Sequence, residues 1–171
     1  MFPRKMSKSF TAELMYLNKS GKPEPVLLVT DAFNIWTDVT PAGTGWLCLP
    51  ETHRNYETNR LNLRFDLLEE EEDALYYRIS CSRDCKGYVG AHLDTSRNGY
   101  LGLYGAFPGG VYWKFEKVNV LTGYDDLRPA FKLFNNRGER VGYKRDDKVR
   151  YLNSSEDTKP LTFTLDNYEA V

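Results

Sequence analysis

The side chains that could carry chemistry in this chain are few, and their spacing fits no catalytic or metal site. The two histidines, His53 and His92, lie far apart in a sequence of 171 residues. Cys81 and Cys85 do not have the Cys-x-x-Cys spacing of redox and zinc sites, and no second cysteine pair completes one. No Gly-x-Ser-x-Gly nucleophile turn and no phosphate-binding loop occurs. We therefore predict a non-catalytic protein that uses no metal and no cofactor.

The cysteines and the start of the chain bear on the cellular compartment. Cys48, Cys81 and Cys85 are too few for a disulfide framework. Cys81 and Cys85 could bridge locally, but the odd number and the lack of a signal sequence favour reduced thiols. No run approaches the roughly 18 apolar residues of a membrane span. These features predict a protein that is cytoplasmic, or secreted without a conventional signal peptide, and that has no membrane span.

The charge balance argues against a general attraction to polyanions. The formal net charge is −1 at pH 7, so electrostatics favour neither nucleic acid nor an anionic membrane surface. A basic cluster near the end of the chain could bind sulfated glycans or phosphates, but Glu139, Asp146 and Asp147 interrupt it. We therefore predict a salt-bridged surface there. The cluster consists of Arg137, Arg140, Lys144, Arg145, Lys148 and Arg150.

One stretch of alternating residues offers a different chemistry, the recognition of sugars. Tyr100, Gly102 and Tyr104 would point to one side of a strand, while the leucines between them point to the other. Two aromatic rings that flank an open glycine present a surface on which the apolar face of a sugar can stack. Asp94 and Asn98 lie close enough in the sequence to hydrogen-bond its hydroxyl groups. The same pattern also fits an ordinary hairpin surface.

Two loop-like segments carry further candidate aromatic residues. Residues 31–45 form an insertion with Trp36 and Asp38, and residues 105–110 form a glycine-rich connection with Phe107. Each loop could bind a sugar or a peptide, or could pack over the end of a barrel, and both alternatives remain open. The predicted ligand-binding residues are Trp36, Asp38, Asp94, Asn98, Tyr100 and Tyr104, with Asp146 and Tyr151 in the last third of the chain.

The elements that must position these residues follow from a repeat with a spacing of fifty residues. Segments that begin at Leu61, Val111 and Leu161 each read apolar, polar, apolar, polar, apolar, acidic. Alternation with period two is typical of a strand with one buried face. Its threefold return indicates three similar units that share one core.

Short alternating runs between turn residues predict twelve strands in three sets of four. Asn98-Gly99, between two such runs, is the strongest hairpin signal in the chain. The predicted strands cover residues 11–17, 26–30, 45–49, 61–67, 75–81, 87–93, 100–104, 111–118, 130–134, 141–144, 149–152 and 161–166. The predicted core consists of Leu47, Leu49, Leu63, Phe65, Leu101, Leu103, Trp113, Phe115, Leu152, Phe163 and Leu165.

In this pattern the chain resembles the β-trefoil superfamily, which includes ricin-type and amaranthin-type lectins, protease inhibitors, fascin and several cytokines. The resemblance lies in three units of about fifty residues with four strands each, which close on an apolar-x-aromatic-x-apolar strand. It implies an all-β fold of three four-stranded repeats of about 50 residues with pseudo-threefold symmetry. The repeats would cover residues 10–68, 72–120 and 127–168 of a single domain that spans residues 1–171. Proteins of this superfamily are usually binding modules and seldom enzymes.

One departure from the lectin pattern limits what the resemblance carries over. Ricin-type lectins have Gln-x-Trp in the closing strand, whereas this chain contains no glutamine. The equivalent tripeptides here begin at Leu63, Trp113 and Phe163, so no sugar site can be transferred by that motif.

The expected function is lectin-like binding of a glycan or glycoprotein in shallow sites between hairpins. Two alternatives remain. In the first, loops 31–45 and 105–110 bind a protein partner, as in protease inhibitors of this superfamily. In the second, the domain is a cytoskeletal, actin-binding module of the fascin type.

Overall fold

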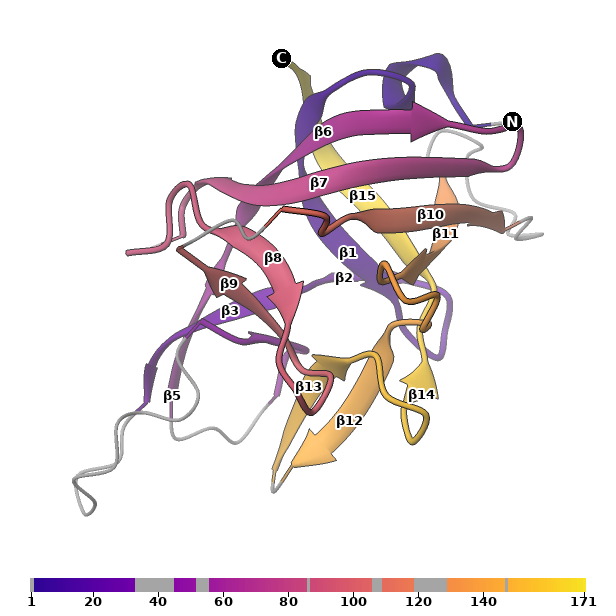
Figure 1. The fold of residues 1–171 in the computed structure, drawn as a ribbon. Coiled ribbons are helices and arrows are strands. Elements are labelled where there is room, and N and C mark those ends of the chain that lie inside the picture. The colour runs from indigo at the N-terminus through magenta and orange to yellow at the C-terminus, as the bar shows by residue number, and fades with distance from the viewer. Residues whose placement is uncertain are drawn as a thin grey trace.

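Alternating apolar residues bring six strands into a closed antiparallel barrel (Figure 1). The computed structural model describes residues 2–32, 45–51, 56–85, 87–105, 109–118, 129–146 and 148–171. The barrel strands follow the order β10, β11, β15, β1, β6, β7, and β7 pairs back with β10 to close the ring. They are β1 (Phe10–Leu17), β6 (Asn62–Glu70), β7 (Ala74–Arg83), β10 (Trp113–Val118), β11 (Ala130–Phe134) and β15 (Phe163–Ala170).

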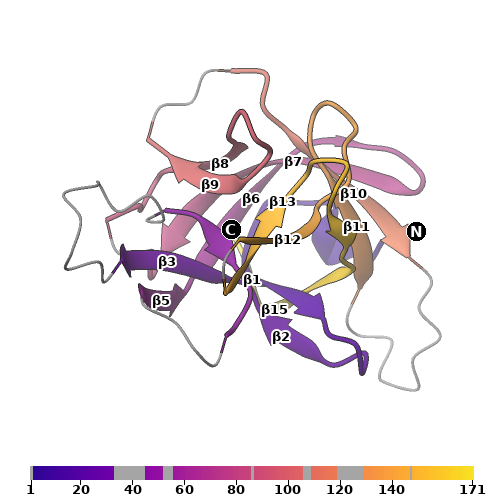
Figure 2. The same cartoon turned by 90° about the horizontal axis from the view of Figure 1, so that it is seen from below.

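The remaining strands extend the barrel sheet or form a second sheet. A hairpin of β8 (His92–Thr95) and β9 (Leu101–Tyr104) continues from β7, and β2 (Pro23–Pro25) pairs with β1. A separate six-stranded sheet runs in the order β14, β12, β13, β4, β3, β5. Its strands are β3 (Leu27–Ala32), β4 (Leu47–Cys48), β5 (Tyr56–Arg60), β12 (Gly142–Asp146), β13 (Val149–Asn153) and β14 (Lys159–Pro160). Figure 2 shows the molecule from below, where β8–β9, β3–β5 and β12–β13 lie around the end that is lowest in Figure 1.

The all-β prediction is confirmed, but the predicted β-trefoil with pseudo-threefold symmetry is wrong. The structure is a closed six-stranded antiparallel barrel with additional strands, and these additions are not three equivalent sets. Strands β8 and β9 remain in the barrel sheet, whereas β3, β4, β12 and β13 join β5 and β14 in a sheet of their own. The error has a physical cause: period two specifies which face of a strand is buried, but not which strand lies beside it.

The repeat correctly predicts the interior of the barrel. Its three segments lie on β6, β10 and β15, which are every second strand of the ring. All eleven predicted core residues are buried, and none is more than 7% exposed. Aromatic rings fill the centre, where Phe115 stacks on Phe131 with centroids 4.1 Å apart and Phe10 stacks on Phe65 at 4.8 Å.

The chain start closes one end of the barrel. A 3₁₀ turn, η1 (Arg4–Met6), precedes β1, and Phe2 and Met6 are buried in the main core. The hydroxyl of Tyr77 donates a hydrogen bond to the Met6 carbonyl, and that of Tyr168 donates to the Lys5 carbonyl at 2.6 Å. Both termini therefore lie at the same end of the barrel (Figure 1). Within the described ranges, no helix is long and apolar enough to cross a membrane.

The expectation of reduced thiols is corrected at one pair of cysteines. Cys81, on β7, and Cys85 form a disulfide, with their Cα atoms 6.3 Å apart. Both residues are almost completely buried. Cys48, on β4, is also buried. The sequence left a local bridge open as an alternative. The odd number of cysteines wrongly favoured reduced thiols over this bridge.

Two buried tyrosines make stability depend on pH in alkaline solution. Burial, together with the hydrogen bond to Glu24 and its charge, raises the pKa of Tyr16 from 10.0 to about 12. Burial also raises the pKa of Tyr77. Below pH 10 the folded and unfolded chains both keep these phenols protonated, so the full stability is present. Above pH 10 the unfolded chain loses the protons first, and this favours unfolding.

We expect the free energy of unfolding to fall by about 2 kcal/mol through Tyr16 alone as the pH rises from 10 to 12. Urea unfolding at a series of pH values measures this decline. Tyr16→Phe should be less stable at neutral pH, because Glu24 loses its donor, but its decline with pH should be shallower. An equally steep decline in both proteins would contradict the assignment to Tyr16.

Candidate functional site

The candidate site is built where the short segment Gly45–Trp46 passes between β3 and β9. The Gly45 N–H donates to the Val29 carbonyl at 2.8 Å, and the Val29 N–H donates to the Trp46 carbonyl at 2.9 Å. On the other side, the Leu103 N–H donates to the Gly45 carbonyl at 2.9 Å. Gly45 has a φ of 85°, which favours glycine. These bonds fix the backbone that carries the Trp46 indole.

Four half-buried rings follow one another across this region, and we call them the aromatic row. The Trp46 ring lies between Tyr104 and Tyr100, with its centroid 6.3 Å from the first and 6.2 Å from the second. Tyr151 continues the row, with its centroid 5.8 Å from that of Tyr100. All three contacts are edge-to-face, an arrangement that aromatic rings favour.

Gly102 makes room for the indole at the centre of the row. It pairs with Trp46 in an isolated β-bridge, and a Cβ atom added at Gly102 would lie 2.8 Å from Cε3 of that ring. Any larger residue would therefore displace the tryptophan. The sequence predicted an open glycine between two tyrosines. The structure corrects this, because Trp46 covers the glycine and joins the two tyrosines into a continuous surface.

Asp94 provides a carboxylate beside the row. It lies on β8 directly opposite Gly102, so its side chain and the row share one face of the hairpin. One of its oxygens accepts a hydrogen bond from the Thr95 N–H at 2.7 Å, which orients the carboxylate. Burial, and then the charge of Asp94, raises the pKa of Tyr104 above its usual value of 10.0. A tyrosine hydroxyl is protonated at neutral pH even without such a shift, so that of Tyr104 can donate a hydrogen bond.

The β8–β9 hairpin is attached to the second sheet, and this attachment brings Tyr151 to the row. Tyr100 forms a β-bridge with Asn153 at the end of β13, and the Ser154 N–H donates to the Gly99 carbonyl at 2.9 Å. The Asn153 amide donates to the Asn98 carbonyl at 3.2 Å. Two residues before Asn153, Tyr151 therefore lies close to Tyr100.

The structure brings together half of the predicted ligand-binding residues. Asp94, Tyr100, Tyr104 and Tyr151 meet at the row, although Tyr151 lies in the last third of the chain. The Asn98 side chain is exposed on the hairpin turn, and Asp146 is exposed at the end of β12, opposite Val149. Two further predicted residues, Trp36 and Asp38, lie outside the described residues, as does Phe107.

Sequence reasoning missed Trp46, the central ring of the row. A usable signal was present, because Leu47 and Leu49 were correctly predicted to face the core. Alternation along the same strand places Trp46 on the opposite face from Leu47. A tryptophan predicted to face outward is a candidate for binding, because tryptophan and tyrosine are enriched at interfaces.

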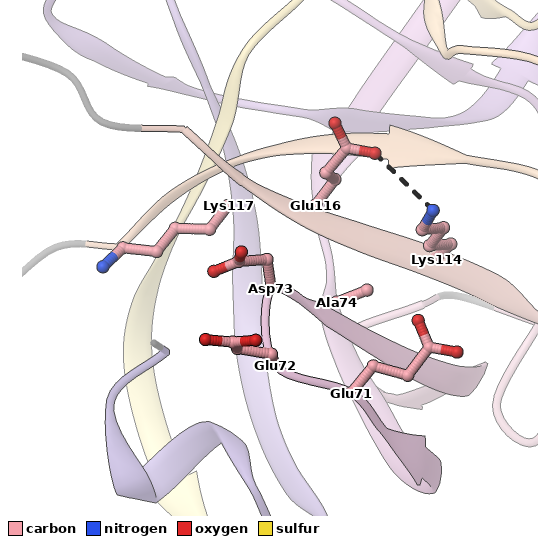
Figure 3. Close-up of a pocket in the computed structure, with 7 residues that line it drawn as sticks. All are labelled: Glu71, Glu72, Asp73, Ala74, Lys114, Glu116 and Lys117. Atoms are coloured by element: carbon pink, nitrogen blue, oxygen red, sulfur yellow. Dashed lines mark ion pairs between the residues drawn. The ribbon is translucent and has the colours of Figure 1, made fainter.

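A second candidate, an acidic hollow at the end of the barrel where the chain starts, has no feature that identifies a ligand. Its volume is 590 Å³, and it lies between the β6–β7 turn and β10 (Figure 3). Lys114 and Glu116, both on β10, form an ion pair at 3.6 Å along one wall of the hollow. In the part of the chain that the structure describes, no three His, Cys, Asp or Glu residues are arranged to hold a metal ion. The lining residues are Glu71, Glu72, Asp73, Ala74, Lys114, Glu116 and Lys117.

The prediction of a salt-bridged surface around the basic cluster is confirmed. Arg150 binds Glu51 at 2.7 Å and also donates to the Pro50 carbonyl at 2.8 Å. Arg137 pairs with Glu139 at 2.9 Å. The charges of these two arginines are neutralised by their neighbours, so both are weak candidates for binding anions.

The aromatic row is therefore the strongest candidate site in the described residues. Comparison of the chain with protein-family models, with curated protein sequences and with solved structures finds no match in any of the three, so the geometry of the row is the basis for its chemistry.

Proposed function

We propose that the aromatic row binds carbohydrate and that the protein is a non-catalytic, glycan-binding module. The observation that carries this proposal is the covering of Gly102 by Trp46, which makes one surface from rings on separate strands. Aromatic faces attract the C–H groups on the apolar side of a sugar ring. The Asp94 carboxylate can accept hydrogen bonds from hydroxyl groups, and the Tyr104 hydroxyl can donate one.

Packing alone accounts poorly for the position of these rings. Trp46, Tyr100 and Tyr104 are half-buried and belong to neither of the two apolar clusters among the described residues. Tyr151 packs at the edge of the smaller cluster, which consists of Leu27, Val29, Cys48 and Val149. A surface group of large rings beside a carboxylate is the composition expected of a shallow sugar site.

Replacing Trp46 with alanine should weaken glycan binding at least tenfold, which corresponds to about 1.4 kcal/mol. The central stacking surface is lost, and Tyr100 and Tyr104 lose the ring that joins them. A glycan array identifies a ligand, and isothermal titration with that glycan measures the affinity of each variant. Thermal unfolding monitored by circular dichroism establishes that the variant is folded.

Tyr112→Ala is the matched control, because Tyr112 is 36% exposed and contacts Tyr76 rather than the row. Its glycan affinity should equal that of the unmodified protein. Lack of binding to every glycan at millimolar concentration would refute the proposal. Equal affinities of Trp46→Ala and the unmodified protein would refute the assignment to the row.

A further inference from the structure

The aromatic row follows β9. Tyr100 and Tyr104 are four residues apart on an extended chain, so their Cα atoms are separated by about 13 Å. The Trp46 ring is almost equally far from both tyrosine rings, at 6.2 and 6.3 Å. Trp46 therefore lies between the two tyrosines.

The row continues past the end of β9 onto the second sheet. Tyr151 adds one more ring at the Tyr100 end, with a separation of 5.8 Å. Lys144 lies directly opposite Tyr151 on β12, so the two side chains share a face. The ammonium of Lys144 pairs with the Asp157 carboxylate at 4.0 Å, and the Asp157 side chain is 84% exposed. Such an exposed pair is weak, which leaves the ammonium able to donate to a ligand.

Hydrogen-bonding groups thus occur at two separate positions along the row. Asp94 lies at the level of Trp46, because both residues pair with Gly102. Lys144 lies at the level of Tyr151. Tyr100 separates these positions, with one ring contact on each side. A single sugar ring is about as wide as one aromatic ring, so one monosaccharide cannot contact both positions.

We infer that the ligand is a linear oligosaccharide that lies along the row, with one sugar unit at Trp46 and Asp94 and a later unit at Tyr151 and Lys144. This inference rests on the proposed function and adds the class of glycan. A shallow surface buries little of any one sugar, so much of the binding free energy must come from successive units. Affinity should therefore increase with chain length until the oligosaccharide reaches Tyr151.

The test is a titration of the unmodified protein with saccharides of increasing length. Suitable probes are the series from N-acetylglucosamine to its hexamer, from glucose to cellohexaose and from mannose to mannohexaose. In the series that binds, we expect affinity to rise at least tenfold between the monosaccharide and the tetrasaccharide, and little beyond that. A monosaccharide that binds as tightly as its tetramer would overturn the inference without affecting the proposed function.

Variants of Tyr151 locate the later sugar unit. Tyr151→Ala should remove most of the gain with chain length and so weaken the tetrasaccharide much more than the monosaccharide, whereas Tyr151→Phe should keep the gain because it retains the ring. Equal weakening of the monosaccharide and the tetrasaccharide by Tyr151→Ala would overturn the inference. Failure of all three series, and of a glycan array, to show binding would instead overturn the proposed function. Circular dichroism and thermal unfolding verify the fold of each variant. The length series is measured on the unmodified protein, so it tests the inference even if a variant does not fold.

Discussion

Replacing Phe115 with alanine is expected to lower the free energy of unfolding by about 3–5 kcal/mol. Phe115 is fully buried on β10 and stacks on Phe131 with centroids 4.1 Å apart. Its ring centroid also lies 4.7 Å from that of Tyr77 and 5.7 Å from that of Phe65. The Phe115 ring therefore contacts residues of both strands that flank β10, which are β11 and β7. Alanine would leave a cavity among rings that cannot close around it. Urea unfolding measures the loss.

The next residue along β10 provides the matched control. Glu116 is on the outward face of the strand, and its side chain is 39% exposed. Glu116→Ala should change the free energy of unfolding by no more than about 0.5 kcal/mol. Since whole domains are stable by about 5–15 kcal/mol, Phe115→Ala should remain only marginally folded. A loss below about 1 kcal/mol would show that the repeat does not mark the centre of the core.

Replacing Gly142 with alanine is expected to lower the free energy of unfolding by about 3 kcal/mol. Gly142 is held between Asn153 of β13 and Pro160 of β14. An added Cβ atom would lie 2.7 Å from the carbonyl carbon of Lys159 and 3.0 Å from Cα of Pro160, and it would collide with the Lys159 oxygen. These are backbone atoms, so the clash cannot be relieved by rotating a side chain. Strand β14 would have to separate from β12.

In a chain of this size, about 3 kcal/mol corresponds to a fall in melting temperature of about 6–12 °C. Gly105→Ala is the control, because nothing lies within 4 Å of an added Cβ there and its backbone is not left-handed. Its melting temperature should stay close to that of the unmodified protein. Equal melting temperatures of the two variants would show that the contact between β12 and β14 contributes little to stability.

The strands and the core could be predicted from the sequence because both depend on local alternation. Eleven of the twelve predicted strands are present within a few residues of the expected limits, and the Asn98-Gly99 turn joins β8 to β9 as expected. The strand predicted at residues 87–93 is wrong over most of its length, because β8 begins only at His92 and the residues before it lie in turns. Strands β2, β5 and β14 were not predicted. They are two to five residues long, and two of them contain proline, so they have little pattern of their own.

The candidate site was predictable only where it is local. Asp94, Tyr100 and Tyr104 lie within one hairpin, and the turn signal and alternation place them on one face. Trp46 and Tyr151 are each about fifty residues away along the chain from Tyr100. Their positions depend on the pairing of Trp46 with Gly102 and of Tyr100 with Asn153. No local pattern specifies such pairings.

The sequence by itself therefore determined eleven of the buried core residues, which follow from period two and from the return of one pattern every fifty residues. Only the tertiary structure decided which strands are neighbours. The choice of neighbours produced both the barrel with its separate second sheet and the joining of four rings into one row. The physical reason is that burial of alternate residues acts along a single strand, whereas the choice of partner strand depends on competition among many distant pairings and on the cost of closing the loops between them.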